Sequence, residues 1–551
     1  MSNTNSVFKK VPAKVQRLNG FDQSHMNLFT GKIGTLVPVL VDRLMPGDKV
    51  SLGSTFRVCM PPMATDFLGK VSANVRAFFV PERLIYGGWK EFMMYSGGIA
   101  DQFKPAGLVR TYLPELLVTN ASSASGTLLD YLGMKGGSGE HVASDSAIAY
   151  HLIWSDWYRD PRIQVDPFYH GQDGNSVAYV RGTRYTSAHE FDITGGSDLF
   201  ADNTSVFALR QVNYEKDYFT SAFTDQYGGA SPMSVAVAPF VLPSTETGTN
   251  PNLQNPVGST GISNASGQAK TQIGTFSIPQ VRAANQLQRF AEKMCLSGGV
   301  YQDAILAEYG VRPSDGLVDR SIYLGSLTAS VYNNTVYATM SNDNDQSTNP
   351  FGVSQASAGA NSKAIGSGSF VNFEAKEHGI FMVLMDVVPH AVYSTGTRRY
   401  LYSEGDGFVD KFCVPSLAGI GHQPIYQSEL VGGVPDSSKI FGYTDRYADL
   451  KWHGDEVHGF LRKNQSLDAF ALQRFFATTD TPTINSAFIR VNTTDMDNVT
   501  AVSSSLSNYG YWCDMYHSYK LVRPLPAYSI PSLEGLDNSK IVMVDRNGRR
   551  F

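Results

Sequence analysis

Cysteine is scarce in this chain, with four residues among 551, and the four lie far apart in the sequence. None of them forms a C-x-x-C pair, and the wide spacing favours buried, reduced thiols over a disulfide framework. Reduced thiols are typical of a protein made in a reducing cytoplasm. The four residues are Cys59, Cys295, Cys413 and Cys513.

Long apolar runs are also missing. The longest, GIFMVLMDVV at residues 379–388, is far shorter than the roughly 20 residues that a membrane-spanning helix needs. The first residues, MSNTNS, are polar and contain no apolar segment of a signal peptide. We therefore expect a soluble protein that is made in the cytoplasm and does not insert into a membrane.

Charged residues make up only 17% of the chain, whereas typical globular domains contain about 25%. A surface this poor in charge indicates that other molecules cover part of it. The net charge of −5 argues against a chain that condenses nucleic acid by itself, because that activity requires a strong basic excess.

Basic residues are nevertheless concentrated at both ends of the chain. The N-terminal group precedes the first acidic residue, Asp22, and the C-terminal group is opposed only by Asp545. These residues either belong to solvated tails or contact the phosphates of DNA, and the sequence leaves both interpretations open. The candidates for DNA contact are Lys9, Lys10, Lys14, Arg17, Arg546, Arg549 and Arg550.

Motifs of catalysis and cofactor binding are absent. The chain contains no G-x-x-x-x-G-K-[ST] loop, no G-x-G-x-x-G after a strand and no G-x-S-x-G elbow. His453 and His458 have the wrong spacing for a zincin, and NDNDQS at residues 342–347 lacks the glycine of a calcium loop. We predict no catalytic, cofactor-binding or metal-binding residues and no cofactor, and hence a protein that is not an enzyme.

The sequence does contain strong strand signals. In the strand predicted at 71–80, apolar residues alternate with Ser72, Asn74 and Arg76, and Pro81, which cannot donate to a sheet ladder, ends the strand. Residues 379–388 are apolar throughout, as in a strand that is buried on both faces. Further strands are predicted at 36–41, 54–60 and 517–528, and the absence of a regular βαβ alternation favours an antiparallel sandwich.

Helices are fewer. One is predicted between a cap at Ser277 and the pair Gly298-Gly299, because apolar residues recur there at helical spacing. Shorter helices are predicted at 150–159 and 300–309. In the helix at 150–159, Trp154 and Trp157 lie three residues apart and are expected to share a face.

Four segments rich in Gly, Ser, Thr and Asn are predicted to be long loops, at residues 120–147, 171–213, 243–275 and 332–368. An eight-stranded jelly roll needs only about 50 residues of strand, so most of this chain would be insertion. Insertions of this kind can order by packing on neighbouring subunits. The pattern therefore favours a protein that assembles over a monomeric enzyme.

Aromatic and basic residues cluster in two segments, directly after Pro81 and in the helix at 150–159. They could fill a core or an interface between subunits, where Trp, Tyr and Arg are enriched. They could also stack on the bases of single-stranded nucleic acid. We favour the interface, and its candidate residues are Arg83, Tyr86, Trp89, Trp154, Trp157, Tyr158 and Arg159.

Eight segments in this order closely resemble the major capsid protein of the Microviridae, the small single-stranded DNA bacteriophages, and their gokushovirus-like branch in particular. The resemblance runs from about residue 17 to about residue 535, between the Gly/Ser-rich loops. The segments are LVPVLVDRLMPGD (36–48), RAFFVPERLIYGGWKEFM (76–93), YHLIWSDWYRDPRI (150–163), KDYFTSA (216–222), IPQVRAANQLQRFAEKM (278–294), EHGIFMVLMDV (377–387), GYTDRYADLKW (442–452) and KLVRPLPAYSIPSLEG (520–535).

The resemblance implies a mainly β fold, an eight-stranded antiparallel jelly roll with long loop insertions and a few helices. It divides the chain into an N-terminal arm (1–35), one capsid domain (36–535) and a basic C-terminal tail (536–551). In gokushovirus-like members an insertion forms a surface protrusion at the threefold axes that is thought to engage the host. Residues 230–277 occupy the matching place here, although 171–213 is also long enough.

The resemblance further implies a T=1 icosahedral shell of sixty copies around circular single-stranded DNA. The partners would be other copies of the chain, the genome on the inner face, a small basic DNA-binding protein, an internal scaffolding protein and a host cell-surface receptor. The protein would belong to the virion and assemble in the cytoplasm of a bacterial host. The alternative is a jelly-roll carbohydrate-binding or polysaccharide-degrading protein, which would leave the eight matching segments unexplained.

Overall fold

The structure is a computed structural model of the chain. The residues that it describes are 18–61, 63, 66–86, 89, 93, 115–117, 125–134, 140–168, 193–194, 205–226, 262–263, 269–270, 282, 285–290, 303, 305–306, 310, 312, 314–337, 358–401, 414–432, 439–477, 479–492 and 510–525. Residues 1–17 of the expected N-terminal arm, the whole basic C-terminal tail, Cys295 and Cys413 lie outside the described residues. Cys59 and Cys513 are free thiols.

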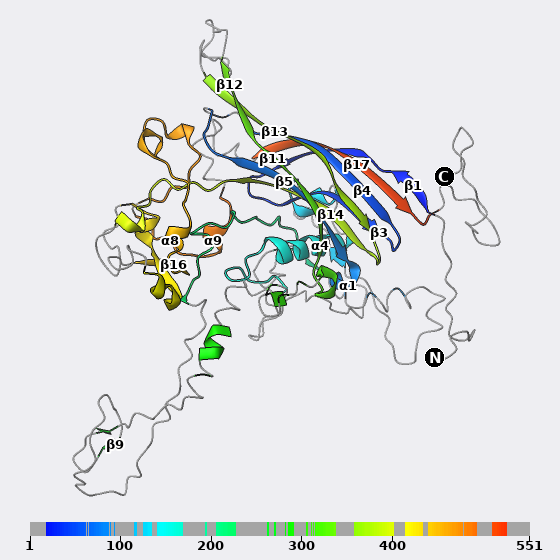
Figure 1. The fold of residues 1–551 in the computed structure, drawn as a ribbon. Coiled ribbons are helices and arrows are strands. Elements are labelled where there is room, and N and C mark those ends of the chain that lie inside the picture. Colours follow the sequence, from blue (N-terminus) through cyan, green and yellow to red (C-terminus); the bar gives the residue numbers. More distant parts are fainter. Residues whose placement is uncertain are drawn as a thin grey trace, which may run out of the picture.

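Two antiparallel sheets packed face to face form the body of the molecule (Figure 1). The six-stranded sheet contains β1 (Asn19–Asp22), β2 (His25–Gly31), β4 (Lys49–Cys59), β12 (Tyr332–Tyr337), β13 (Ala358–Glu374) and β17 (Tyr511–Arg523). The four-stranded sheet contains β3 (Val37–Leu44), β5 (Val71–Pro81), β11 (Ile322–Ser330) and β14 (Gly379–Pro389).

The strand order interleaves early and late parts of the chain. The six-stranded sheet runs β1-β17-β4-β13-β12, with β2 also pairing with β17, and the four-stranded sheet runs β11-β5-β14-β3. This is the Greek-key connectivity of a jelly roll, and the predicted mainly β, antiparallel fold class is confirmed. The count of eight strands is reached only when β1 and β2 are taken as one interrupted strand and β12 as the continuation of β11, which ends two residues before it.

The burial of each strand follows from its place in the sandwich. In β4 the alternate residues Val50, Leu52, Phe56 and Val58 face the other sheet and are buried, while the residues between them reach the surface. β17 alternates in the same way. β14 differs, because ten of its eleven residues are buried, as predicted from its continuous apolar run.

Helical segments cover the outer face of the four-stranded sheet (Figure 1). α1 (Glu82–Ile85) follows β5 directly, and α4 (Asp145–Ile153) lies against β5 and β14. α4 continues without a break into a π-helix, η3 (Trp154–Tyr158). The helix predicted at 150–159 is confirmed, although it begins five residues earlier and its last turn is π-helical.

A second, smaller hydrophobic cluster lies beside the sandwich. It contains Tyr218, Ile425, Leu430, Phe441 and Phe488, all of them buried. Two strands, β15 (His422–Tyr426) and β16 (Ile440–Asp445), and the short helices α8 (Ala448–Lys451) and α9 (Ser486–Ile489) belong to this part of the chain, which is drawn in yellow and orange in Figure 1. Residues 218–222 and residues that follow β14 thus build a satellite core.

The remaining elements are short. Between Ser277 and Gly298, the described residues Arg282 and 285–290 are helical, as are Asp303 and 305–306 in the helix predicted at 300–309. The others are β6 (Glu115–Leu117), α3 (Leu128–Tyr131), β7 (His141–Ala143), β8 (Ile193–Thr194), β9 (Ile262–Ser263), β10 (Ala269–Lys270), η5 (Asp315–Leu317), η6 (Arg399–Leu401), η7 (Pro415–Ile420), η8 (Gln427–Glu429), η9 (Gly459–Leu461) and η10 (Asp468–Phe470).

The prediction of a loop over residues 332–368 is wrong at both ends, because β12 and much of β13 lie there. The small residues that signalled a loop have a packing role. A Cβ atom on Gly366 would lie 2.6 Å from the ring of Phe56, so β13 can pair with β4 at this point only without a side chain. The loop predicted at 120–147 likewise contains α3 and β7.

Phe381 provides a test of the sandwich core. Its ring in β14 stacks on Tyr519 of β17, with ring centroids 5.9 Å apart, and so joins the two sheets. We expect Phe381→Ala to lower the free energy of unfolding by about 3–5 kcal/mol, because it leaves a cavity at this junction. Urea denaturation followed by circular dichroism measures the change.

The matched control is Leu317→Ala, since this apolar side chain lies exposed on η5. It should change the free energy of unfolding by no more than about 0.5 kcal/mol. Equal effects of the two substitutions would contradict the assigned core.

Candidate functional site

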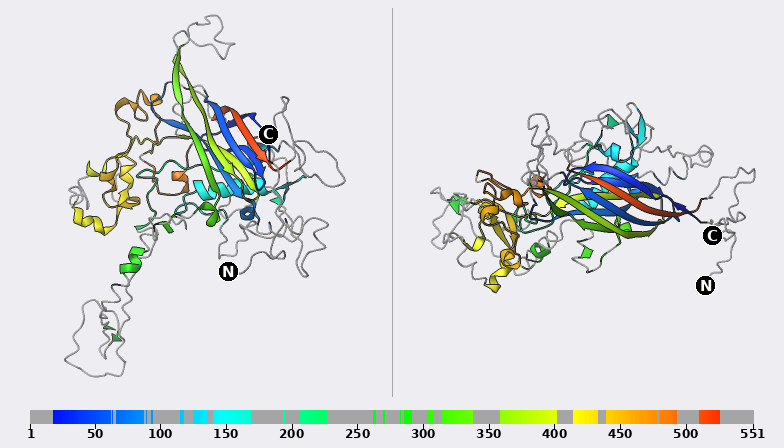
Figure 2. Two further views of the ribbon diagram at one scale, coloured as in Figure 1. Left: turned by 45° about the vertical axis from the view of Figure 1, so that its right-hand side comes forward. Right: turned by 90° about the horizontal axis from the view of Figure 1, so that it is seen from above.

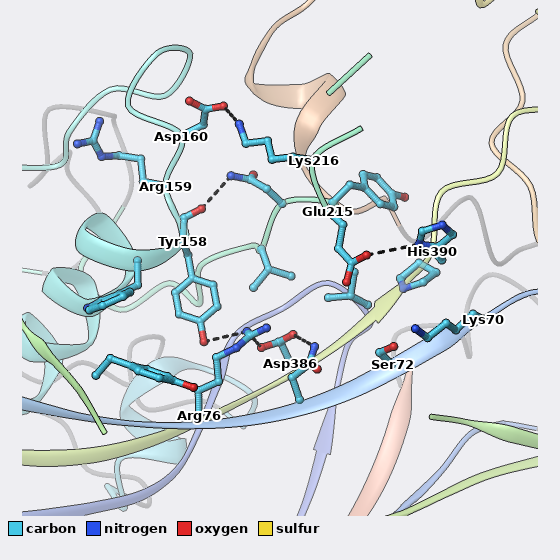
Figure 3. A pocket seen from close by; sticks show the side chains of 18 of the residues that line it. Lys70, Ser72, Arg76, Tyr158, Arg159, Asp160, Glu215, Lys216, Asp386 and His390 are labelled. Atoms are coloured by element: carbon cyan, nitrogen blue, oxygen red, sulfur yellow. Dashed lines mark hydrogen bonds and ion pairs between the residues drawn. The ribbon is translucent and has the colours of Figure 1, made fainter. Parts of the chain in front are cut away.

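A hollow of about 470 Å³ opens on the outer face of the four-stranded sheet (Figure 3). Its floor comes from alternate residues of β5 and from β14, and its walls come from the end of η3 and from residues 212–216. The lining residues are Lys70, Ser72, Asn74, Arg76, Phe78, Trp157, Tyr158, Arg159, Asp160, Val212, Asn213, Tyr214, Glu215, Lys216, Tyr323, Asp386, Val388, Pro389 and His390.

The floor of the hollow is a buried ion pair. Asp386 is only 1% exposed, and Arg76 Nη1 donates to its Oδ1 at 2.6 Å. Asn74 Nδ2 donates to its other oxygen at 2.8 Å, and Arg76 also donates to the hydroxyl of Tyr158 at 3.3 Å. Burial raises the pKa of the Asp386 carboxyl, against the opposing effects of Arg76 and Asn74.

The rim of the hollow is charged, and its carboxylates have basic neighbours. Asp160 accepts hydrogen bonds from Lys216 and Arg162. His390 Nδ1 lies 3.6 Å from a carboxylate oxygen of Glu215. Because every carboxylate that lines the hollow has a basic partner, the site is suited to hydrogen bonding and aromatic contact rather than to acid–base chemistry.

Three of the predicted interface residues, Trp157, Tyr158 and Arg159, meet at this hollow. Trp157 Nε1 donates to the carbonyl oxygen of Ser321 at 3.0 Å, and the guanidinium of Arg320 lies 3.8 Å above its ring. The three side chains are partly buried, so each retains exposed surface. The structure therefore brings the second aromatic and basic cluster to a single concave site.

Trp154 lies elsewhere. Its ring is almost fully buried, and its Nε1 donates to the carbonyl oxygen of Gln211 at 2.8 Å. The two tryptophans contact different segments, so the expected shared face is not observed. The wider turn of the π-helix accounts for this, because three residues span less of a turn there than in an α-helix.

The segment after Pro81 packs back on its own chain. Ile85 and Tyr86 are buried in the sandwich core. Arg83 pairs with Asp319 and, through Nε at 3.0 Å, with Glu377. Of the interpretations offered for this segment, the core holds for Ile85 and Tyr86, since their side chains find their partners within the chain.

Of the predicted interface residues, Tyr86 and Trp154 thus retain almost no surface for a neighbouring subunit. Trp89 is only partly buried, and its ring lies 5.7 Å from that of His378. Arg83, Tyr86 and Trp89 therefore form a group at α1 that is separate from the hollow. The DNA-contact candidates Lys9, Lys10, Lys14, Arg17, Arg546, Arg549 and Arg550 lie outside the described residues.

Sequence reasoning missed the ion pair of Arg76 and Asp386. The two residues are 310 positions apart, so no local pattern connects them. A signal was nevertheless present, because each is the only charged residue in its strand segment, 71–80 and 379–388. A lone charge in a buried strand predicts a buried partner.

In the described part of the chain, no group of three or more His, Cys, Asp or Glu side chains could hold a metal ion. No helix among these residues is long and apolar enough to cross a membrane.

This chain is similar to known capsid proteins. The model of the capsid protein (F protein) family matches residues 9–533. The capsid protein VP1 of Chlamydia phage 1 is 27% identical, over 96% of this chain and 97% of the relative. The capsid proteins VP1 of Bdellovibrio phage phiMH2K and Spiroplasma virus 4 are each 24% identical, over 96% and 92% of this chain and 98% and 94% of those relatives.

Asp386→Asn tests the ion pair at the floor of the hollow. The substitution keeps the size of the side chain but removes the charge that faces Arg76. We expect the free energy of unfolding to fall by about 3 kcal/mol, the low end for a broken buried pair, because the Arg76 side chain is 32% exposed. Urea denaturation measures the loss.

Glu374→Gln is the matched control, because the pair of Lys49 and Glu374 is exposed on both sides. Its effect should be about 0–1 kcal/mol. A loss in the control as large as in Asp386→Asn would contradict the distinction between the two pairs.

Glu82, at the start of α1, makes a prediction about pH. Burial, reinforced by Asp145, raises the pKa of its carboxyl from 4.5 to about 8. The unfolded chain ionises Glu82 near pH 4.5 while the folded chain keeps it protonated. The contribution of Glu82 to the free energy of unfolding is therefore fully present below pH 4.5. It is lost as the pH rises to about 8, by at most about 1.4 kcal/mol per pH unit.

Glu82→Gln should flatten the fall in stability between pH 5 and pH 8. Denaturation midpoints of the parent and the variant across this range measure the difference. If the parent and the variant show the same dependence of stability on pH, Glu82 is ionised in the folded protein over this range.

Proposed function

Since the chain belongs to the capsid protein (F protein) family, and is thus a bacteriophage major capsid protein, we propose that sixty copies of it close into a T=1 icosahedral shell around a circular single-stranded DNA genome. The observation that carries the proposal is the family match over residues 9–533. A jelly roll with this strand order supports it, because the fold is common in viral capsids. The function is mechanical, and we infer that the chain has no enzymatic activity.

Closure of such a shell requires heterologous contacts around the fivefold and threefold axes and isologous contacts at the twofolds. We propose that Arg83, Trp89, Trp157, Tyr158 and Arg159 contribute to these contacts with their exposed parts. Tyr86 and Trp154 would support them from inside the chain, because both are buried. Each contact can be weak, since many act together once the shell is closed.

We propose residues 230–277 as the surface protrusion that engages a receptor on a bacterial host. Its described part, the pair β9–β10, lies well apart from the sandwich in Figures 1 and 2. A segment that projects in this way can meet another surface before the body of the molecule does. Residues 171–213 are the second candidate.

The family implies the remaining partners, and the net charge of the chain supports one of them. At a net charge of −5, this chain cannot neutralise a genome alone. We propose that a small basic DNA-binding protein does so inside the shell, with help from the basic tails, and that an internal scaffolding protein takes part in assembly. The protein would assemble in the bacterial cytoplasm and remain in the virion.

Electron microscopy of the chain co-expressed with its neighbouring viral genes tests the proposal. We expect uniform icosahedral particles a few tens of nanometres across. The control is a chain shortened before residue 510, which lacks β17 and should give no particles. Monomers or dimers alone, with the partner proteins present, would contradict the shell and favour a carbohydrate-binding or polysaccharide-degrading protein.

The same particles test the protrusion. Replacement of residues 230–277 by a short Gly-Ser linker should leave particle yield unchanged and abolish adsorption to the host. The matched control is an equal replacement of residues 171–204. If adsorption is lost only in that control, the assignment of the two segments is reversed.

A further inference from the structure

Among the described residues, the outer face of the six-stranded sheet is left exposed. Within the described part of the chain, large apolar side chains on this face remain accessible to solvent. Leu28 is 70% exposed, Ile365 67%, Met26 62%, and Trp512 and Tyr516 46% each. We call the outward side chains of β2, β17, β4 and β13 the open sheet face. It contrasts with the outer face of the four-stranded sheet, which the chain covers with its own helices.

Two aromatic rings occupy the centre of the open sheet face. Trp512 and Tyr516 lie on β17, which pairs with β2 on one side and with β4 on the other. The two residues are four positions apart along the strand, a distance of about 13 Å, so each ring can take its own stacking partner. Their neighbours in register across β4 are small, Cys59 and Thr55, which leaves the rings accessible.

Basic residues stand beside these rings. Lys363 of β13 lies in the same cross-strand row as Trp512, because both are in register with Cys59. Arg57 lies one row further and pairs with Asp514 at 3.2 Å, which neutralises the carboxylate between the two rings. Lys520 adds a further positive charge along β17, next to Asp22. Aromatic rings flanked by basic side chains are the pattern of a single-strand binding surface.

The open sheet face also points away from the proposed protrusion. In Figures 1 and 2 the hairpin that contains β9 lies on one side of the molecule, beyond α1 and α4. The six-stranded sheet lies on the other side. If residues 230–277 face the host, the open sheet face is directed to the inside of the shell; this step rests on the proposed function.

We propose that the open sheet face binds single-stranded nucleic acid, with bases stacked on Trp512 and Tyr516 and phosphates held by Lys363, Arg57 and Lys520. Exposed rings on a flat sheet require bases that are unpaired and unstacked, which a duplex does not offer. The exposed apolar side chains beside the rings, Met26 and Leu28, extend the surface on which bases can lie. The contact would be independent of sequence, since every base has a stacking face.

Fluorescence anisotropy of a labelled 20-nucleotide oligothymidylate with the purified full chain tests this site. Replacement of Trp512 or Tyr516 by Ala should weaken binding by about 5- to 150-fold for each ring. Trp512→Phe and Tyr516→Phe should retain most of the affinity. Lys363→Gln and Lys520→Gln should each lower the slope of log affinity against log salt by about 0.7.

Phe460→Ala is the matched control, because Phe460 is an exposed aromatic residue on η9, away from the sandwich sheets. It should leave the affinity unchanged. A duplex of the same length should bind more weakly and should not respond to loss of the rings. Equal affinities of the parent and the Trp512→Ala/Tyr516→Ala double variant would overturn the proposal.

Electron microscopy of co-expressed particles separates this inference from the proposed function. Particles that form with the double variant, combined with unchanged oligonucleotide binding, would overturn the inference and leave the shell intact. Loss of particles with unchanged binding would assign the open sheet face to a protein contact instead. Absence of particles from the parent chain would remove the proposed function, while the anisotropy experiment would still decide whether the face binds single strands.

Discussion

The burial of β14 on both of its faces is the constraint on which the rest of the structure depends. One face contributes Phe381 to the core between the sheets, and the other carries Asp386 beneath the hollow. A carboxylate on such a strand is removed from water, and Arg76 of β5 supplies its partner. α4 covers the same side, so the core, the hollow and the helical layer all depend on a single strand and its register with β5.

This arrangement gives the two sheets different surroundings. The four-stranded sheet lies between the core and the insertions of its own chain, whereas the six-stranded sheet has the core on one side only. Strand composition follows this difference, with a continuous apolar run in β14 and strict alternation in β17. A protein subunit in a shell has an inner and an outer face with different surroundings. In this chain the two sheets already differ, because the insertions cover only the four-stranded sheet.

Much of the fold could be predicted from the sequence because its signals are local. The alternation in residues 71–77, the end of β5 at Pro81 and the continuous burial of β14 each follow from side chains next to one another. The hollow could not be predicted in the same way, because its ion pair joins distant residues. The π-helical turn at Trp154 and the return of Tyr86 to the core depend on tertiary packing, which overrides local pattern. Composition predicted a loop around Gly366, but this residue lies in a strand and lacks a side chain because the ring of Phe56 occupies that space.

The position of β17 has a consequence for the order of events during synthesis. All four strands of the four-stranded sheet lie before residue 390, so that sheet can form while the ribosome is still translating the rest of the chain. The six-stranded sheet must wait for residues 511–523, because β17 is the strand that joins β1 and β2 to β4. A chain released early therefore leaves its N-terminal strands without a neighbour. The two sheets of the sandwich are therefore completed at different times, the four-stranded sheet first and the six-stranded sheet only when residues near the end of the chain have been made.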